Sequence, residues 1–145
     1  AEPYLEFYDN VITQMDLESF DIKKLKAQDI EALCEDILAQ LQETDTKYKK
    51  FTKVHFPCTI IMDHQSYPMP FHAGDGLVVT AMFSKYWNKT WGGEIITYHD
   101  TEPEDIVSAF PGRIYVSHGT PWNRIQQPNI KADIELQFVQ FRLAN

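Results

Sequence analysis

Histidines and aspartates in the second half of the chain are the side chains best able to hold a metal ion. Imidazole nitrogens and carboxylate oxygens are common ligands of divalent metals. The candidates are His64, His72 and His118, together with Asp63 and Asp75. His64 and His72 flank a proline-rich loop and Asp75 lies between two glycines, so each also has a simpler interpretation as a loop or turn residue. The two cysteines, Cys34 and Cys58, are not spaced as a metal-binding pair.

The composition is that of a folded domain with an acidic surface. The chain has 145 residues, of which 43% are hydrophobic and 13% aromatic, so we expect a single domain over residues 1–145. Its 13 Lys+Arg and 21 Asp+Glu give a net charge of −8, which disfavours nucleic acids and anionic membrane surfaces as partners. No apolar run has the length of a membrane span and the sequence opens without a signal-peptide pattern, which together predict a cytoplasmic protein.

Apolar spacing divides the chain into a helical first part and a β-rich remainder. Ile30, Leu33, Ile37 and Leu41 fall on one helical face and predict a helix with Asp29 as its N-cap, after an opening strand at 4–10. From position 56 onward, nearly all the prolines and all six glycines separate short runs rich in Val, Ile, Thr and aromatic residues. The expected strands are 58–62, 77–83, 94–98, 113–116, 124–126 and 133–143, with 99–105 as an acidic loop. This pattern predicts a mainly β jelly roll at 54–145, supported by the strand and helix of 1–53.

Three segments, taken in order, carry a resemblance to one enzyme family. They are Gly74-Asp75-Gly76 before a strand, residues 87–94 with their paired glycines, and residues 110–116 around Pro111-Gly112-Arg113. Their order and spacing resemble the prolyl 4-hydroxylase-like branch of the 2-oxoglutarate and iron(II)-dependent oxygenases, including its short bacterial and phage-encoded members. The resemblance covers about residues 54–143 and implies a double-stranded β-helix, which is a cupin-like jelly roll. The resemblance also adds a second expectation for the location of the protein: it could be virus-encoded and associated with the virion instead of cytoplasmic.

The resemblance also implies where the chemistry of the family would lie. In that family one His-x-Asp element and one later histidine hold the iron, and a basic residue on a late strand binds the far carboxylate of 2-oxoglutarate. Carried over to this chain, the two histidine positions are Ile61 and Asn123, and the carboxylate position is Asp63. The basic anchor falls at Asp133, and the tyrosine that faces the cosubstrate falls at Ser84. Only the carboxylate is kept, so both motifs are degenerate and no cofactor is expected.

Two functions therefore stay open. The first is a non-catalytic protein of oxygenase fold, acting as a binding or structural assembly module through a protein partner or self-association. The second is an active iron(II)- and 2-oxoglutarate-dependent dioxygenase that hydroxylates a prolyl or other peptide side chain at an atypical metal site. That site would draw its ligands from Asp63, His64, His72, Asp75 and His118, with Arg124 or Lys131 as the anion anchor.

Overall fold

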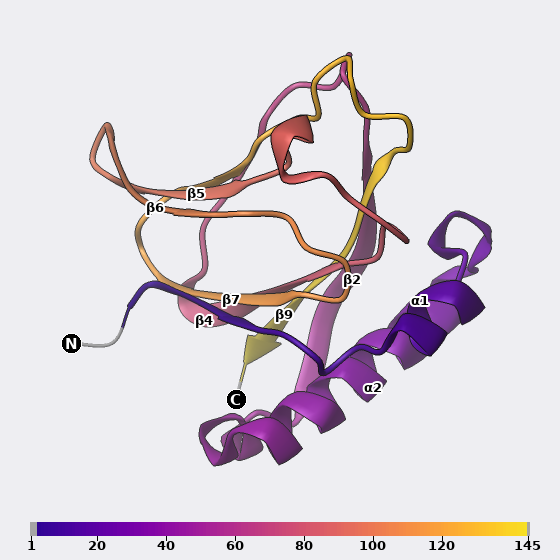
Figure 1. Cartoon of the computed structure of the whole chain (residues 1–145). Helices are drawn as coiled ribbons and strands as arrows, with labels where there is room; N and C mark the ends of the chain where they lie inside the picture. Colours follow the sequence, from indigo (N-terminus) through magenta and orange to yellow (C-terminus); the bar gives the residue numbers. More distant parts are fainter. Residues whose placement is uncertain (1–2, 145) are drawn as a thin grey trace.

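The computed structural model describes residues 3–144, which form two antiparallel sheets with helices packed on one of them (Figure 1). The five-stranded sheet has the order β1 (Leu5–Tyr8), β7 (Ile114–Gly119), β4 (Gly74–Met82), β9 (Leu136–Ala144) and β2 (Lys53–Met62). The four-stranded sheet has the order β3 (Met69–Phe71), β8 (Asn123–Ile125), β5 (Ile95–His99) and β6 (Glu102–Val107). From β2 to β9 the chain alternates between the sheets, except at the β5–β6 hairpin. This is a double-stranded β-helix, so the expected fold class is confirmed.

The helices follow the apolar spacing of the first 50 residues. They are α1 (Gln14–Ser19) and α2 (Ala27–Thr44), with 3₁₀ turns η1 (Ile22–Lys24), η2 (Thr46–Lys50) and η3 (Lys89–Trp91). The predicted helix is α2, but it begins before Asp29. Lys26 is its N-cap, and the Lys26 N–H donates to Asp29 Oδ2 at 3.2 Å, which keeps this carboxylate in the first turn. Helix α1 is an addition to the expected elements and starts at a capping box between Thr13 and Asp16. None of the helices described within 3–144 is long and apolar enough to cross a bilayer.

Two apolar cores lie on opposite faces of the five-stranded sheet. The helix-side core joins α2 residues such as Cys34 and Leu41 to the sheet residues Val79 and Phe141. The inter-sheet core fills the space between the sheets and contains Phe71, Met82, Ile95, Tyr115 and Phe138, among others. Neighbouring residues of a strand enter different cores because side chains alternate across a sheet.

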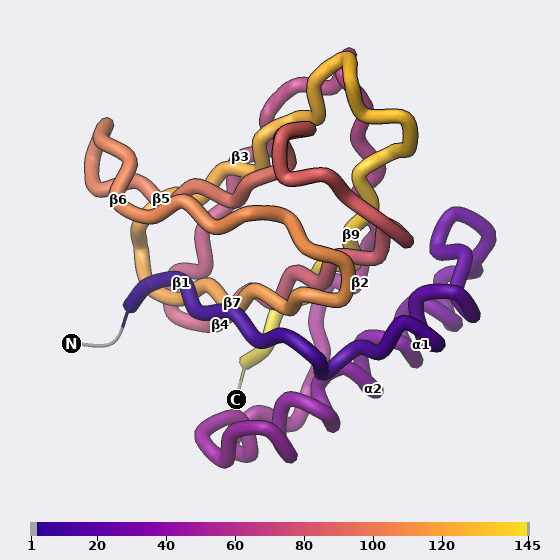
Figure 2. Tube along the Cα trace, viewed as in Figure 1, coloured from indigo at the N-terminus to yellow at the C-terminus, as the bar shows by residue number. Residues whose placement is uncertain are grey.

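Three expected boundaries are wrong. Residues 99–105 are not a loop, because β5 and β6 pair through them as a hairpin. Part of the proline-rich loop is the short strand β3, which pairs with β8. The last strand begins at Leu136, so Asp133 lies in the turn before it. The opening strand is confirmed as β1, which pairs with β7 at the edge of the five-stranded sheet (Figure 2).

The two ends of the barrel are called the Asp63 end and the His72 end, after one residue at each. At the Asp63 end, β2 and β4 finish and β9 begins. At the His72 end, β3, β5 and β7 finish, and β4 and β8 begin.

Candidate functional site

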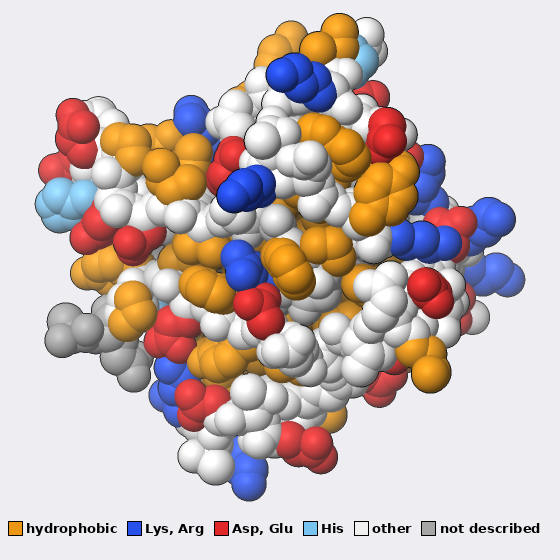
Figure 3. All heavy atoms as spheres, viewed as in Figure 1, with side chains coloured by type: hydrophobic (Ala, Val, Ile, Leu, Met, Phe, Trp, Pro, Cys, Tyr) orange, Lys and Arg blue, Asp and Glu red, His pale blue; other side chains and the backbone are white. Residues whose placement is uncertain are grey.

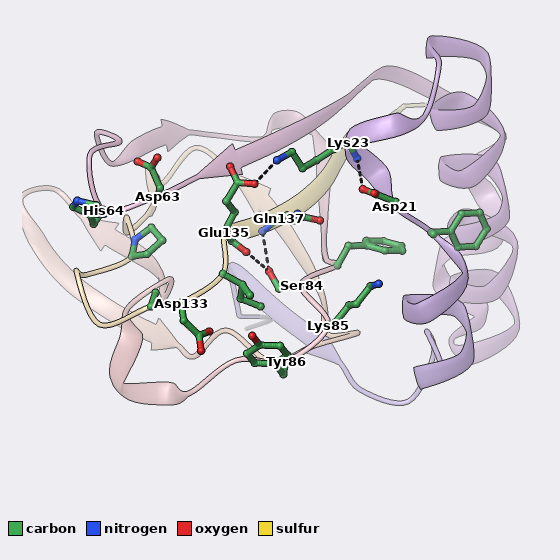
Figure 4. A pocket seen from close by; sticks show the side chains of 15 residues that line it. Asp21, Lys23, Asp63, His64, Ser84, Lys85, Tyr86, Asp133, Glu135 and Gln137 are labelled. Atoms are coloured by element: carbon green, nitrogen blue, oxygen red, sulfur yellow. Dashed lines mark hydrogen bonds and ion pairs between the residues drawn. The ribbon is translucent and has the colours of Figure 1, made fainter.

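The structure distributes the predicted site residues between the two ends of the barrel. At the Asp63 end, a cavity of about 570 Å³ is lined by Asp63, His64, Ser84 and Asp133 (Figure 4). At the His72 end lie His72, Asp75, His118 and Asn123. On β9, the partners of Ile61 and Leu77 are Gln137 and Leu143, six positions apart (143 − 137), so about 20 Å of strand separates the ends.

The two positions that the resemblance assigned to lost histidines do not come together. Ile61 lies near the Asp63 end and packs against the helix-side core. Asn123 is buried at the His72 end, where Thr97 Oγ1 donates to its Oδ1 at 2.8 Å. Ile125, two residues along β8, belongs to the inter-sheet core, so Asn123 points between the sheets. The 62-residue separation (123 − 61) predicts that these two positions share one site, and in the structure they do not.

Asp63 holds a turn. Its Oδ1 accepts a hydrogen bond from the Gln65 N–H at 2.8 Å, and Ser66 Oγ accepts one from the Asp63 N–H at 3.0 Å. The side chain is exposed, as is the neighbouring His64. These bonds shape the start of the β2–β3 connection, which places both residues on the wall of the cavity.

At the His72 end, the histidines contact neighbouring residues and do not converge on a common metal site. The His72 ring meets Trp122 edge to face, with centroids 4.5 Å apart, and its buried Nδ1 has no hydrogen-bond partner among the described residues. His118 bonds through Nε2 to the carbonyl of Pro3, next to β1. Asp75 is exposed near the start of β4, where the pairing with β7 is irregular. Within residues 3–144, no three His, Cys, Asp or Glu side chains are grouped closely enough to hold a metal ion.

The residues expected to bind a cosubstrate are also dispersed. Ser84 Oγ donates to the Glu135 carbonyl and accepts from the Gln137 N–H, both at 2.9 Å, so it ties the end of β4 to the start of β9. Arg124 lies on the opposite face of β8 from Asn123, with its guanidinium 5.2 Å from the Tyr98 ring centroid. Lys131 and Asp133 are exposed in the turn before β9.

Sequence reasoning missed Arg142, the basic side chain that the last strand does carry. Arg142 is in phase along β9 with Phe138 of the inter-sheet core, so it points between the sheets. It donates to the carbonyl oxygens of His72 at 2.8 Å and Ala73 at 3.3 Å, which fixes the β3–β4 turn. The alternation along β9 was the signal that could have found it. With its donors already used by backbone carbonyls, Arg142 serves the fold in this structure.

Charged residues that the sequence did not single out complete the wall of the cavity at the Asp63 end. Lys23 and Glu135 form an ion pair at 2.5 Å, and this partner raises the pKa of Lys23. The hydrogen bond with Asp133 raises the pKa of Tyr86, because a deprotonated Tyr86 would place its negative charge beside the Asp133 carboxylate. Figure 4 shows Asp63 and Asp133 on one side of the cavity and Lys23 and Lys85 on the other. The cavity is therefore a polar depression with charges of both signs.

Comparison with known proteins agrees with the fold. No family model and no curated protein sequence matches the chain. Among solved structures, eleven chains match. One is a prolyl hydroxylase from Trichoplax adhaerens, in complex with a hypoxia inducible factor oxygen degradation domain peptide fragment. The match has a TM-score of 0.55 and covers 97% of this chain and 83% of that chain.

The chain has the prolyl hydroxylase fold. The sequence identity is 10%, so the likeness extends to the fold of the 2-oxoglutarate oxygenases and does not carry the activity with it. The residues present do not fit the iron and 2-oxoglutarate that such a fold implies. Asp63 and His64 lie at one end of the barrel, and His72, Asp75 and His118 at the other end are not grouped closely enough to hold a metal ion within residues 3–144. The inter-sheet core lies between the two sheets.

Proposed function

We propose that this protein is a non-catalytic relative of the 2-oxoglutarate oxygenases, in which the fold serves as a binding or assembly module. The observation that carries the proposal is the closed interior between the two sheets. Phe138, Leu136, Met82 and Ile95 are all fully buried there. Three surface cavities of the described residues are lined by side chains outside the inter-sheet core. A bound cosubstrate would have to displace close-packed side chains.

Some of the polar side chains that face the interior are paired with one another, whereas Ser117 Oγ, in phase with Tyr115 on β7, is buried without a hydrogen-bond partner among the described residues. Thr97 donates to Asn123, and Gln140 Nε2 donates to Thr80 Oγ1 at 3.0 Å. Such pairs satisfy buried groups at little net cost, whereas a metal ligand must keep its lone pair directed at the ion. The interior polar residues therefore support packing of the two sheets.

The test is an anaerobic titration of metal-free protein with iron(II), with and without 2-oxoglutarate, followed by an assay for 2-oxoglutarate decarboxylation. We expect no stoichiometric endpoint, no visible charge-transfer band and no turnover, while an active prolyl hydroxylase in the same buffers gives all three. A stoichiometric endpoint that His72→Ala abolishes would overturn the proposal. The chain would then be an active oxygenase with an atypical site, and a search for a peptide substrate would follow.

A further inference from the structure

The β5–β6 hairpin is an acidic arm of the molecule. Every residue from 99 to 106 is exposed, and the hairpin projects from the left of the barrel in Figure 1. A two-stranded ribbon is at best marginally stable by itself, so an arm with both faces in water has surface available for a partner. We refer to residues 99–106 as the acidic hairpin.

Negative charge is concentrated on this hairpin. It carries Asp100, Glu102, Glu104 and Asp105, and the sequence has no Lys or Arg from residue 90 to residue 112. None of these four carboxylates takes part in the ion pairs of the described chain. In Figure 3, red side chains gather at the left edge, over the hairpin. Two apolar side chains are also exposed here: Ile106, the last residue of the hairpin, at 63%, and Phe110 after it, at 55%.

The edge of the hairpin is protected against strand pairing. Pro103 lacks an N–H, and a register shift interrupts the β5–β6 pairing between Thr97 and Tyr98. Charge, proline and irregular pairing are the means by which proteins block the addition of a further strand. A partner is therefore recognised through the carboxylates rather than through the backbone.

The same chain presents a complementary basic surface after α2. Four of its 13 Lys+Arg residues fall within residues 47–53. Lys47 is bound to Glu6 at 2.6 Å, whereas Lys49, Lys50 and Lys53 are exposed. We refer to Lys49, Lys50 and Lys53 as the basic turn. A cavity of about 310 Å³, with Lys50 and His118 on its wall, lies beside it.

We propose that the acidic hairpin of one molecule docks against the basic turn of a second copy. The hairpin and η2 lie far apart in Figures 1 and 2, so the two charged surfaces of one molecule do not meet. A net charge of −8 makes copies repel one another in general, so attraction has to come from a local match of opposite charges. This inference rests on the assembly role proposed above and names its partner.

Sedimentation velocity and light scattering of the full chain test this contact, with no iron or 2-oxoglutarate present. In about 0.05 M salt we expect a concentration-dependent dimer or larger assembly, and in about 0.5 M salt an affinity weaker by at least about tenfold, because salt screens exposed charges. Lys49→Glu with Lys50→Glu should give monomers, and so should Glu102→Lys with Glu104→Lys. Mixing these two double variants should restore association, since each supplies the charge that the other has lost.

Matched controls change the same number of charges on other surfaces. They are Lys85→Glu with Lys89→Glu, and Glu18→Lys with Asp36→Lys, all at exposed positions. Both controls should associate like the unmodified chain. A monomer at every concentration and salt would overturn the inference, as would an assembly that the charge reversals leave unchanged. Neither result affects the iron titration, so the failure of this contact and the failure of the non-catalytic proposal are distinguishable.

Discussion

Truncating Phe138 tests whether the space between the sheets is filled. The ring is fully buried in the inter-sheet core and packs edge to face on Tyr115, with centroids 6.3 Å apart. Phe→Ala changes in well-packed cores cost about 3–5 kcal/mol. We expect Phe138→Ala to lower the free energy of unfolding by about 4 kcal/mol, a large part of the roughly 5–15 kcal/mol typical of a domain. Phe138→Leu keeps more volume and should cost less than about 2 kcal/mol.

Urea unfolding followed by circular dichroism measures these differences at constant m-value. Phe56→Ala is the matched control, because Phe56 is 78% exposed and its truncation should change stability by less than about 0.5 kcal/mol. The reasoning would be refuted if Phe138→Ala cost less than about 1 kcal/mol with an unchanged m-value. The interior would then be loosely filled, and the argument against a cosubstrate between the sheets would lose its basis.

Three further changes test other parts of the structure by the same unfolding assay. Ser84→Ala should cost about 1–3 kcal/mol, because two backbone groups between β4 and β9 lose their partner. Burial raises the pKa of Glu6, but hydrogen bonds, chiefly from Lys47, outweigh it and lower the pKa overall. The ionised Glu6 carboxylate should therefore add to the free energy of unfolding at pH values above its ordinary pKa of about 4.3. This stabilisation should disappear as the pH falls through the lower pKa of the folded state, and the Glu6→Gln variant should not show that loss. Gly112→Ala should destabilise by more than about 1 kcal/mol, because φ is +81° and a Cβ would lie 2.7 Å from the Ile12 carbonyl oxygen.

Each of these has a result that contradicts it. If Ser84→Ala left stability intact and altered only 2-oxoglutarate binding, Ser84 would be a ligand and not a tie between strands. If Glu6→Gln and the unmodified chain lost stability in parallel on acidification, the Lys47–Glu6 pair would contribute nothing. A Gly112→Ala variant as stable as the parent would mean that the turn at 112 adjusts freely.

Local patterns predicted most of the elements. The helical spacing of Leu33, Ile37 and Leu41 located α2, and the short Val- and Ile-rich runs between glycines and prolines located most of the strands of the jelly roll. These features depend on which side of a helix or strand is apolar, and that property can be read from residues close together in the chain. The wrong element boundaries lie where the local sequence is compatible with two kinds of structure. The acidic run at 99–105 has the composition of a loop, but pairing with β5 makes most of it a strand.

The resemblance to the oxygenase family predicted the fold, but it did not predict where the site residues lie in that fold. The resemblance places Ile61 and Asn123 in one site because their separation along the chain is similar to a family spacing, yet they lie at opposite ends of the barrel. Distance along a sequence does not report which end of a strand a residue occupies. That depends on strand order and register, which are set by pairings such as β2 with β9 and β3 with β8.

The sequence by itself determined a mainly β domain with one long amphipathic helix and a net negative charge. These follow from composition and short-range periodicity. Only the tertiary structure decided that Arg142 points between the sheets, that Ile61 faces the helices and that Phe138 fills the interior. The acidic hairpin and the basic turn likewise became separate surfaces only when the sheets formed. Such placements depend on contacts between residues far apart in the chain, and no local pattern encodes them.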